Sequence, residues 1–316
     1  GNDFDCIVGV SGGLDSSYMI HKMVTEYGLN PLLFHVDAGW NSDIAVQNIK
    51  SLIDKLNLQL FTEVINWEEM RDFQLALFKS GVPHLDVPQD MAFTGALYKF
   101  AEKFNIKTIL NGGNISTESV APPLNFLYWP TDMVQINHIL KRFCTNPMLT
   151  YPFASIYYTK LWIKYFRRIR MLKPLNFIEF NKNNAIYELQ NIYNWKLYPQ
   201  KHFESRFTSF FEGYWLPSRF GYDMRRNQYS SLILSNQMTR KEALKKLECL
   251  TLNEEEVKRE FDYVAKKLDI DVSELKHYHE MPKKYYWNYP NQKFIFKIGE
   301  KILSYIGGRT TRGGAY

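Results

Sequence analysis

The first third of the chain alternates short apolar runs with segments of helical periodicity. Residues 4–10 are apolar, partly β-branched and followed by glycines, a pattern typical of a buried strand. The same patterns predict further strands at 32–36, 60–65 and 107–110, and helices at 16–27, 44–56 and 90–104. Alternating strands and helices predict an α/β fold, with a parallel sheet covered by helices on both faces.

Beyond about residue 150 this alternation gives way to aromatic and basic stretches with helical character, such as 160–170 and 185–193. Two helix starts here carry the side chains of a capping box: Thr239 with Glu242, and Asn253 with Glu256. We predict an α/β domain at 1–150 and a mostly helical substrate or partner domain at 151–316.

Composition narrows the class of protein. The 45% apolar fraction allows a large core, and no apolar run reaches the ~18 residues of a membrane span. The net charge of +6 is mild, so we expect no dedicated nucleic-acid partner. The chain begins with Gly and a strand follows almost at once, so we expect that further residues precede it in the whole protein.

The three cysteines, Cys6, Cys144 and Cys249, lie far apart in the sequence. This spacing argues against a disulfide framework and against a zinc knuckle within this chain. We therefore expect a cytoplasmic protein. Aromatic residues reach 16%; they form either a well-packed helical core or a pocket that stacks on sugar or base rings.

The segment Ser11-Gly12-Gly13-Leu14-Asp15-Ser16-Ser17 joins the first predicted strand to the first predicted helix. Glycines let backbone amides approach an anion, and the helix N-terminus and the hydroxyls add favourable contacts. The loop is thus a candidate cradle for a polyphosphate. An acid in such a cradle, Asp15, is consistent with a bound Mg²⁺ that bridges phosphate and carboxylate oxygens.

This loop is not a Walker loop, because it lacks the Gly-Lys-Ser/Thr ending. It resembles the PP-loop of asparagine, GMP and NAD synthetases and of tRNA-modifying thiolases. The resemblance implies the adenine-nucleotide α-hydrolase-like fold, ATP as cosubstrate, and cleavage of ATP between its α and β phosphates.

Other strings narrow the resemblance. They lie at 35–42, 83–90, 110–118, 201–207 and 216–226. Together with the loop they resemble the N-acetyl sugar amidotransferase family of bacterial surface-glycan and lipopolysaccharide biosynthesis. The resemblance runs from about residue 3 to 250 or beyond, and the late strings are its most specific part.

The resemblance implies that an acetamido group on an activated, nucleotide-linked sugar becomes an acetamidino group for O-antigen or flagellin glycans. Ammonia would come from a separate glutaminase through a barrel protein, both resembling subunits of imidazole glycerol phosphate synthase. The family usually carries an N-terminal extension with cysteine pairs, which this chain lacks.

The loop residues Ser11, Gly12, Gly13, Ser16 and Ser17 are expected to hold pyrophosphate, and Asp15 to bind Mg²⁺. Val36 and Asp37 are expected to flank adenosine, although Asp37 equally suits an Asx turn. Gly112 and Gly113 are expected to let the backbone approach the nucleotide, with a plain turn as the alternative.

Asp15, Lys201 and Glu118 are the catalytic candidates. Lys201 suits neutralisation of pyrophosphate; Glu118 suits Mg²⁺ binding or proton relay from ammonia, or else lies exposed. The candidates for substrate contact are Gln89, Asp90, Asn114, Arg206 and Arg219. Asp90 also suits a helix N-cap, and Arg219 also suits a solvated face. His202 is a weaker acid–base candidate.

Two other functions stay open. A tRNA-modifying PP-loop enzyme, of the thiolase or lysidine-synthase type, would need a reactive cysteine pair or a strong basic surface. A non-catalytic nucleotide-binding module would bind ATP through the loop but would not release pyrophosphate with any acceptor.

Overall fold

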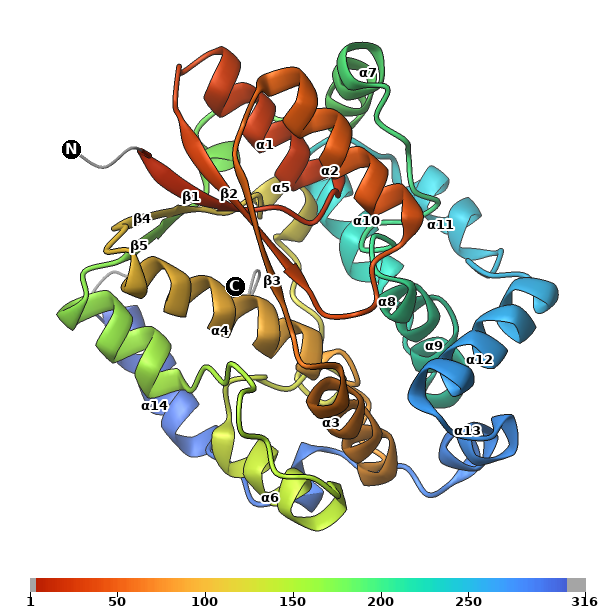
Figure 1. Cartoon of the computed structure of the whole chain (residues 1–316). Helices are drawn as coiled ribbons and strands as arrows, with labels where there is room; N and C mark the ends of the chain where they lie inside the picture. The colour runs from red at the N-terminus through yellow and green to blue at the C-terminus, as the bar shows by residue number, and fades with distance from the viewer. Residues whose placement is uncertain (1–3, 306–316) are drawn as a thin grey trace.

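The computed structural model describes residues 4–305 and contains a five-stranded parallel sheet in the order β3-β2-β1-β4-β5 (Figure 1). The strands are β1 (Cys6–Gly9), β2 (Pro31–Asp37), β3 (Leu60–Val64), β4 (Thr108–Leu110) and β5 (Arg170–Leu172). From β1 the chain winds outward through β2 to β3, and then crosses to β4 on the other side of β1. In sheets of this kind ligands bind beyond the carboxyl ends of the strands where the order reverses. Here that point lies between β1 and β4.

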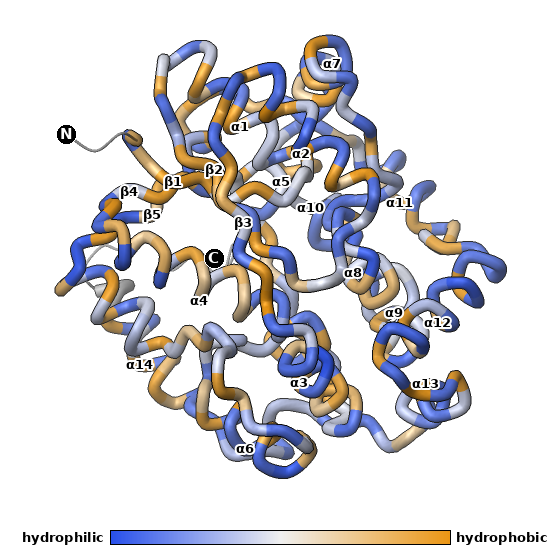
Figure 2. The backbone as a smooth tube through the Cα atoms, in the orientation of Figure 1, coloured by the Kyte–Doolittle hydropathy of each residue, from blue (hydrophilic) through white to orange (hydrophobic). Residues whose placement is uncertain are grey.

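The strand sequences explain why both faces of the sheet are covered. Successive residues of a strand point to opposite faces. Ile7 belongs to the apolar core on one face, whereas Cys6 and Val8 belong to the core on the other. All three are buried, and β1 is drawn as hydrophobic in Figure 2. This confirms the predicted parallel sheet between two layers of helices.

The helices have the following bounds. Residues 14–166 contain α1 (Leu14–Thr25), α2 (Asp43–Leu56), α3 (Trp67–Ser80), α4 (Val87–Lys103), α5 (Ile115–Glu118), α6 (Met133–Phe143) and the π-helix η1 (Tyr158–Phe166). Then follow η2 (Pro174–Asn176), α7 (Lys182–Tyr193), α8 (Arg206–Phe210), η3 (Phe211–Trp215), α9 (Leu216–Phe220) and α10 (Arg225–Leu234). The last are α11 (Arg240–Leu247), α12 (Glu254–Leu268), α13 (Val272–Glu280), η4 (Tyr286–Asn288) and α14 (Lys293–Tyr305).

The structure corrects two expectations about these elements. Strands do not end before residue 150, because β5 pairs in parallel with β4 through Ile109 and Met171. Three residues at a sheet edge are too few for a period-two pattern to appear in the sequence. The helix expected at 90–104 begins earlier, at Val87, with Asp86 in the N-cap position. Asp90 is therefore not an N-cap.

Both predicted capping boxes are confirmed. The side chains of Thr239 and Glu242 satisfy each other's backbone amides at the start of α11. Asn253 and Glu256 do the same at the start of α12.

The segment after residue 200 returns to the sheet. The amide of Ser42 donates to the carbonyl of Glu204 at 2.9 Å, and the amide of Arg206 donates to the carbonyl of Trp40 at 2.8 Å. Phe78 of α3 packs edge-on against Trp215, with ring centroids 4.8 Å apart. Because residues from both sides of position 150 share these cores, we retain a domain boundary there only as a proposal.

Among residues 4–305, no helix has both the length and the apolar character needed to cross a membrane.

Candidate nucleotide and substrate site

A cavity of about 460 Å³ opens beyond the carboxyl ends of β1, β2 and β4. Its wall includes Val10, Val36 and Gly112 at the strand ends, part of α4, and the segment at 197–212. Its volume falls within the range of pockets that hold small molecules and cofactors. Its place at the reversal of strand order makes it the candidate functional site.

The predicted phosphate loop borders this cavity through Ser11, Asp15 and Ser16. Ser11 Oγ lies 3.3 Å from Ser16 Oγ and accepts a hydrogen bond from the amide of Gly13 at 3.3 Å. The loop leads directly into α1, whose amino-terminal end favours negative charge. The residues present therefore suit the binding of a polyphosphate.

The other loop residues lie behind this surface. The carbonyl of Gly12 accepts hydrogen bonds from Trp195 Nε1 and Tyr198 OH, both at 3.1 Å, which anchor the loop to the segment after α7. Ser17 is fully buried, and its Oγ has no hydrogen-bond partner among residues 4–305. Gly12, Gly13 and Ser17, which were expected to hold pyrophosphate, do not line the cavity. Gly12 and Ser17 support the loop from behind.

Gly112 fits closely against the loop. A Cβ atom at this position would lie 2.8 Å from the carbonyl carbon of Asp15 and 2.8 Å from the amide nitrogen of Ser16. Such contacts with backbone atoms are not tolerated without a shift. Gly112 thus lets the segment after β4 pack directly against the phosphate loop. This close contact explains the glycine at this position better than a plain turn does.

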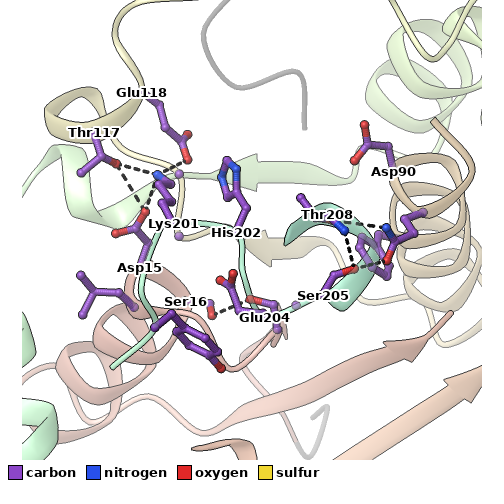
Figure 3. Close-up of a pocket in the computed structure, with 18 of the residues that line it drawn as sticks. Asp15, Ser16, Asp90, Thr117, Glu118, Lys201, His202, Glu204, Ser205 and Thr208 are labelled. Carbon is purple, nitrogen blue, oxygen red and sulfur yellow. Dashed lines mark hydrogen bonds and ion pairs between the residues drawn. The ribbon is translucent and has the colours of Figure 1, made fainter. Parts of the chain in front are cut away.

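Lys201 joins the loop to the segment after β4 (Figure 3). Its Nζ lies 2.7 Å from Asp15 Oδ2, 2.8 Å from Glu118 Oε1 and 2.8 Å from Thr117 Oγ1. Burial works against the charge of Lys201, but the two carboxylates outweigh it and raise its pKa. Burial likewise works against the charge of Glu118, and Lys201 outweighs it and lowers its pKa. Three catalytic candidates that are distant in sequence thus form one charged centre, and their catalytic roles stay a prediction.

The carboxylates of this centre are also of the kind that a divalent cation needs. The oxygens of Asp15, Glu118 and Thr117 that converge here accept hydrogen bonds from Lys201 Nζ. Mg²⁺, which prefers oxygen ligands, would therefore bind beside the lysine and not at the point that its ammonium group occupies. Within residues 4–305, no ready-made cluster of three or more histidine, cysteine or acidic ligands is found. Two lysines that the sequence analysis missed, Lys173 and Lys182, also line the cavity and add positive charge near the loop.

A second polar group lies at the other end of the cavity. Asp86 Oδ2 accepts a hydrogen bond from Thr208 Oγ1 at 2.7 Å, and Oδ1 accepts from Gln89 Nε2. Gln89 Oε1 in turn accepts from Ser205 Oγ at 2.9 Å. Burial, followed by the negative charge of Asp90, raises the pKa of Asp86 to about 7. Gln89 and Asp90 line the cavity as expected, whereas the sequence analysis missed Asp86 and Thr208.

His84 connects this group to Asp90. Its Nδ1 lies 2.9 Å from the carbonyl oxygen of Tyr128, and its Nε2 lies 3.3 Å from Asp90 Oδ2. Both partners are acceptors, so both ring nitrogens carry protons when Asp90 is ionised. Burial works against this charge, but Asp90 outweighs it and raises the pKa of His84.

Between the two ends lie His202 and Glu204. His202 has a left-handed backbone (φ 70°), and its Nδ1 lies 3.1 Å from Glu212 Oε1. Burial works against its charge, but Glu212 outweighs it and raises the pKa of His202 to about 9. The carboxylate of Glu204 covers Gly13, where a Cβ would lie 1.7 Å from Glu204 Oε1. Burial raises the pKa of Glu204.

Four residues that were expected to contact the nucleotide or the substrate do not line the cavity: Asp37, Asn114, Arg206 and Arg219. Asp37 Oδ1 accepts hydrogen bonds from the Gly39 amide and Asn41 Nδ2 at 2.8 and 3.1 Å, the Asx-turn alternative. Asn114 is buried and caps α5 through the Thr117 amide at 3.0 Å. The side chains of Asp37 and Asn114 thus make hydrogen bonds within their own loops. Neither residue lines the cavity.

The two arginines expected to contact substrate are also corrected. Arg206 Nη2 lies 2.9 Å from Glu260 Oε2, and its guanidinium stacks 3.3 Å above the Tyr263 ring centre. Arg219 is buried and donates to the carbonyl of His279. Neither lines the cavity. Arginine is suited to anions and to aromatic faces alike, so the residue type alone did not distinguish the two roles.

Comparison with known families gives one match. Residues 204–303 match the family model described as LPS biosynthesis protein WbpG-like, C-terminal domain. This match agrees, over residues 204–303, with the resemblance to proteins of lipopolysaccharide biosynthesis inferred from the sequence. The matched segment begins at Glu204, so the cavity residues Ser205, Thr208 and Glu212 belong to it. Comparison with curated proteins gives no significant match.

Solved structures with partial similarity include two synthetases and a tRNA thiolase. The NH3-dependent NAD synthetase of Campylobacter jejuni is 13% identical, with 90% of this chain and 91% of that chain covered and a TM-score of 0.35. The U34-tRNA thiolase NcsA of Methanococcus maripaludis is 13% identical, with 75% and 73% covered and a TM-score of 0.37.

The NMN synthetase of Francisella tularensis is 20% identical over 36% of this chain, with a TM-score of 0.28. The chain spans about half of that protein, 48% of its length. All three scores lie below 0.5, so the fold assignment rests on the strand order and on the phosphate loop.

Proposed function

We propose that this protein is an ATP-dependent amidotransferase that converts the acetamido group of a nucleotide-linked N-acetyl sugar into an acetamidino group, releasing AMP and pyrophosphate. The observation that carries the proposal is the charged centre of Asp15, Lys201 and Glu118 beside the phosphate loop, at one end of a cavity that extends to a second polar group around Asp86. The WbpG-like match supports a place in surface-glycan biosynthesis.

The proposed chemistry answers a simple difficulty. An amide carbon is a poor electrophile, and its oxygen is a poor leaving group. Attack of the amide oxygen on the α-phosphorus of ATP forms a P–O bond and expels pyrophosphate, which leaves an O-adenylyl imidate. Ammonia then forms a C–N bond at the imidate carbon, and the C–O bond breaks as AMP departs.

The residues of the phosphate end have separate tasks in this scheme. The loop around Ser11 and Ser16 holds the β and γ phosphates, and Lys201 with Lys173 and Lys182 offsets the charge of the departing pyrophosphate. Asp15 and Glu118 would hold Mg²⁺, which supplies further charge stabilisation when bound. The work of the site is chiefly alignment and charge stabilisation.

Water competes with ammonia at the imidate carbon, and an enclosed site limits this side reaction. The family resemblance therefore supports delivery of ammonia by a glutaminase through a barrel protein. We include these partners in the proposal.

The tRNA-modifying alternative gains no support from the site. In the described part of the chain, the cavity wall contains none of the cysteines. We therefore develop only the amidotransferase proposal.

The test is incubation with Mg-ATP, excess ammonium chloride and a panel of nucleotide-linked N-acetyl sugars, followed by measurement of AMP, pyrophosphate and sugar mass. The expected product is lighter by the difference between an oxygen atom and an NH group. Asp15→Ala is the control that removes the reaction. Release of AMP and pyrophosphate with a tRNA pool, and with no sugar, would overturn the sugar assignment.

A further inference from the structure

The two ends of the cavity differ in charge. Lysines gather at the end formed by the phosphate loop, whereas the opposite end and the wall between them carry four carboxylates: Asp86, Asp90, Glu204 and Glu212. Two imidazoles, His84 and His202, pair with Asp90 and Glu212. Lys201 is already engaged by Asp15 and Glu118. Among the described residues, neither Asp86 nor Glu204 forms an ion pair, although His84 acts electrostatically on Asp86, and His202 and Lys201 on Glu204.

Glu212 offers a second, independent observation. Its Oε1 pairs with His202, but its Oε2 is buried and has no hydrogen-bond partner in the described part of the chain. The Glu212 side chain is 9% exposed and lines the cavity. A buried carboxylate oxygen without a donor is unfavourable, because its hydrogen bonds to water are lost on folding and no protein donor replaces them. It indicates a ligand that donates hydrogen bonds.

Glu212 and Asp86 line the same cavity. The negative charge of Glu212 contributes, after burial and Asp90, to the raised pKa of Asp86. The protein donors to Asp86, Thr208 and Gln89, are neutral groups. Each carboxylate oxygen has two acceptor sites, so one site on each oxygen of Asp86 stays open. A small cation that donates several hydrogen bonds would relieve this repulsion and fill the open sites.

We propose that the acidic end of the cavity binds an ammonium ion between Asp86 and Glu212, and that Asp86 accepts its proton. This inference rests on the proposed amidotransferase function and assigns the ammonia half-site. Ammonium suits the position because it carries one positive charge and four N–H donors. A sugar hydroxyl would donate one hydrogen bond and leave the charge of the carboxylates unbalanced.

The proposed step conserves atoms and charge. Ammonium loses one proton to the Asp86 carboxylate, and its freed electron pair forms the C–N bond to the imidate carbon. The C–O bond breaks, and its own electron pair leaves with AMP. One of the three protons on the new nitrogen passes to the sugar nitrogen, which lost its own proton when the imidate formed, and the product is an amidinium with one positive charge. Thr208 and Gln89 are positioning residues, because they hold Asp86 and do not contact the ammonium nitrogen in this scheme.

The experiment compares two rates in the same preparation. The first is acceptor-dependent exchange of labelled pyrophosphate into ATP without ammonium, which reports adenylation alone. The second is amidine formation as a function of ammonium chloride, at constant ionic strength kept with sodium chloride. The variants are Glu212→Gln and Asp86→Asn. The control is Glu63→Gln, an exposed carboxylate on β3 outside the cavity.

For Glu212→Gln we expect the ammonium KM to rise roughly tenfold or more, since a charge-assisted contact becomes a neutral one. For Asp86→Asn we expect the ratio of amidination to exchange to fall by roughly tenfold or more, the order of a positioned general base. The wild-type rate should also rise as pH passes through about 7, and Asp86→Asn should lose this rise. Glu63→Gln should match the wild type.

Each contrary outcome has its own meaning. An unchanged ammonium KM in Glu212→Gln, with an unchanged ratio in Asp86→Asn, overturns the ammonium site while exchange still supports the proposed function. A raised sugar KM with an unchanged ammonium KM also overturns it, because the acidic end then binds the acceptor. Absence of exchange in the wild type with every acceptor overturns the proposed function itself. If Asp86→Asn does not fold, the near-isosteric Glu212→Gln alone decides.

Discussion

Lys201 Nζ lies 2.7 Å from Asp15 Oδ2, although the two residues are 186 positions apart in the sequence. The contact joins the phosphate loop to the segment that precedes α8, which is also where the WbpG-like match begins. The lysine neutralises an acid that would otherwise repel a polyphosphate. The amino-terminal sheet and the carboxy-terminal region therefore build one site together.

Replacement of Lys201 tests this contact. We expect Lys201→Ala to lower kcat/KM for pyrophosphate release by roughly 10²–10³-fold, the order seen when one charge-stabilising donor is lost. Asp15 and Glu118 would then also face each other without a cation. The measurement is a coupled pyrophosphate assay, with the exposed Lys297→Ala as control. A decrease below a factor of roughly three would contradict the role.

Replacement of Gly112 tests the fit between β4 and the loop. In Gly112→Ala the new Cβ would meet backbone atoms of Asp15 and Ser16 at 2.8 Å, so the loop must shift. Overpacking of this kind costs about 1–3 kcal/mol, and we expect ATP affinity to fall roughly tenfold. Gly299→Ala is the matched control, because nothing lies within 4 Å of its added Cβ. Equal ATP affinity in both variants would show that the loop adjusts freely.

The His202–Glu212 pair predicts a pH dependence of stability. The folded pKa of His202 is raised to about 9, above the value of about 6.5 in an unfolded chain. Its contribution is thus fully present below pH about 6.5 and is lost as pH rises through about 9. The urea midpoint should fall over this interval.

The matched variant is His202→Asn, because asparagine tolerates the left-handed backbone at this position. Its urea midpoint should change less between pH about 6.5 and about 9 than that of the wild type. If the urea midpoints of the two proteins change with pH in parallel, the His202–Glu212 pair is not the source of the pH dependence of stability.

Arg206 is expected to matter for folding and not for substrate. Arg206→Met removes the ion pair with Glu260 and the contact with Tyr263. We expect the free energy of unfolding to fall by about 1–3 kcal/mol, with the sugar KM unchanged. Glu260→Gln and the double variant complete a cycle measured by urea unfolding. A raised sugar KM with normal stability would restore the substrate role expected from the sequence.

Parts of the site formed by residues that adjoin in sequence could be predicted, whereas contacts between distant residues could not. The phosphate loop is a local feature, since the glycines, the hydroxyls and the start of α1 adjoin in sequence. Its place between β1 and α1 was therefore predicted, but not which of its residues line the cavity. Lys201 and Glu118 were predicted through the family resemblance. Their direct contact depends on packing of the 197–212 segment against the sheet, which no local pattern reveals.

Other features of the fold and the site could not be predicted from any local sequence pattern. Asp86 lies one residue before α4, where an acid is usually a cap, yet its side chain caps nothing and turns to Thr208. Strand β5 is only three residues long at the edge of the sheet. Arg219 was expected at phosphate, but burial beside α13 directs it to a backbone carbonyl. In each case a contact distant in sequence decides the role.

The central claim is that the amide oxygen of an acceptor attacks the α-phosphorus of ATP at this site. The most direct measurement uses nucleotide-linked N-acetyl sugars with oxygen-18 in the acetyl carbonyl, and mass spectrometry of the AMP released. The account predicts that the label appears in the phosphate of AMP in step with amidine formation. Unlabelled AMP alongside amidine, or formation of ADP and phosphate instead, would contradict it.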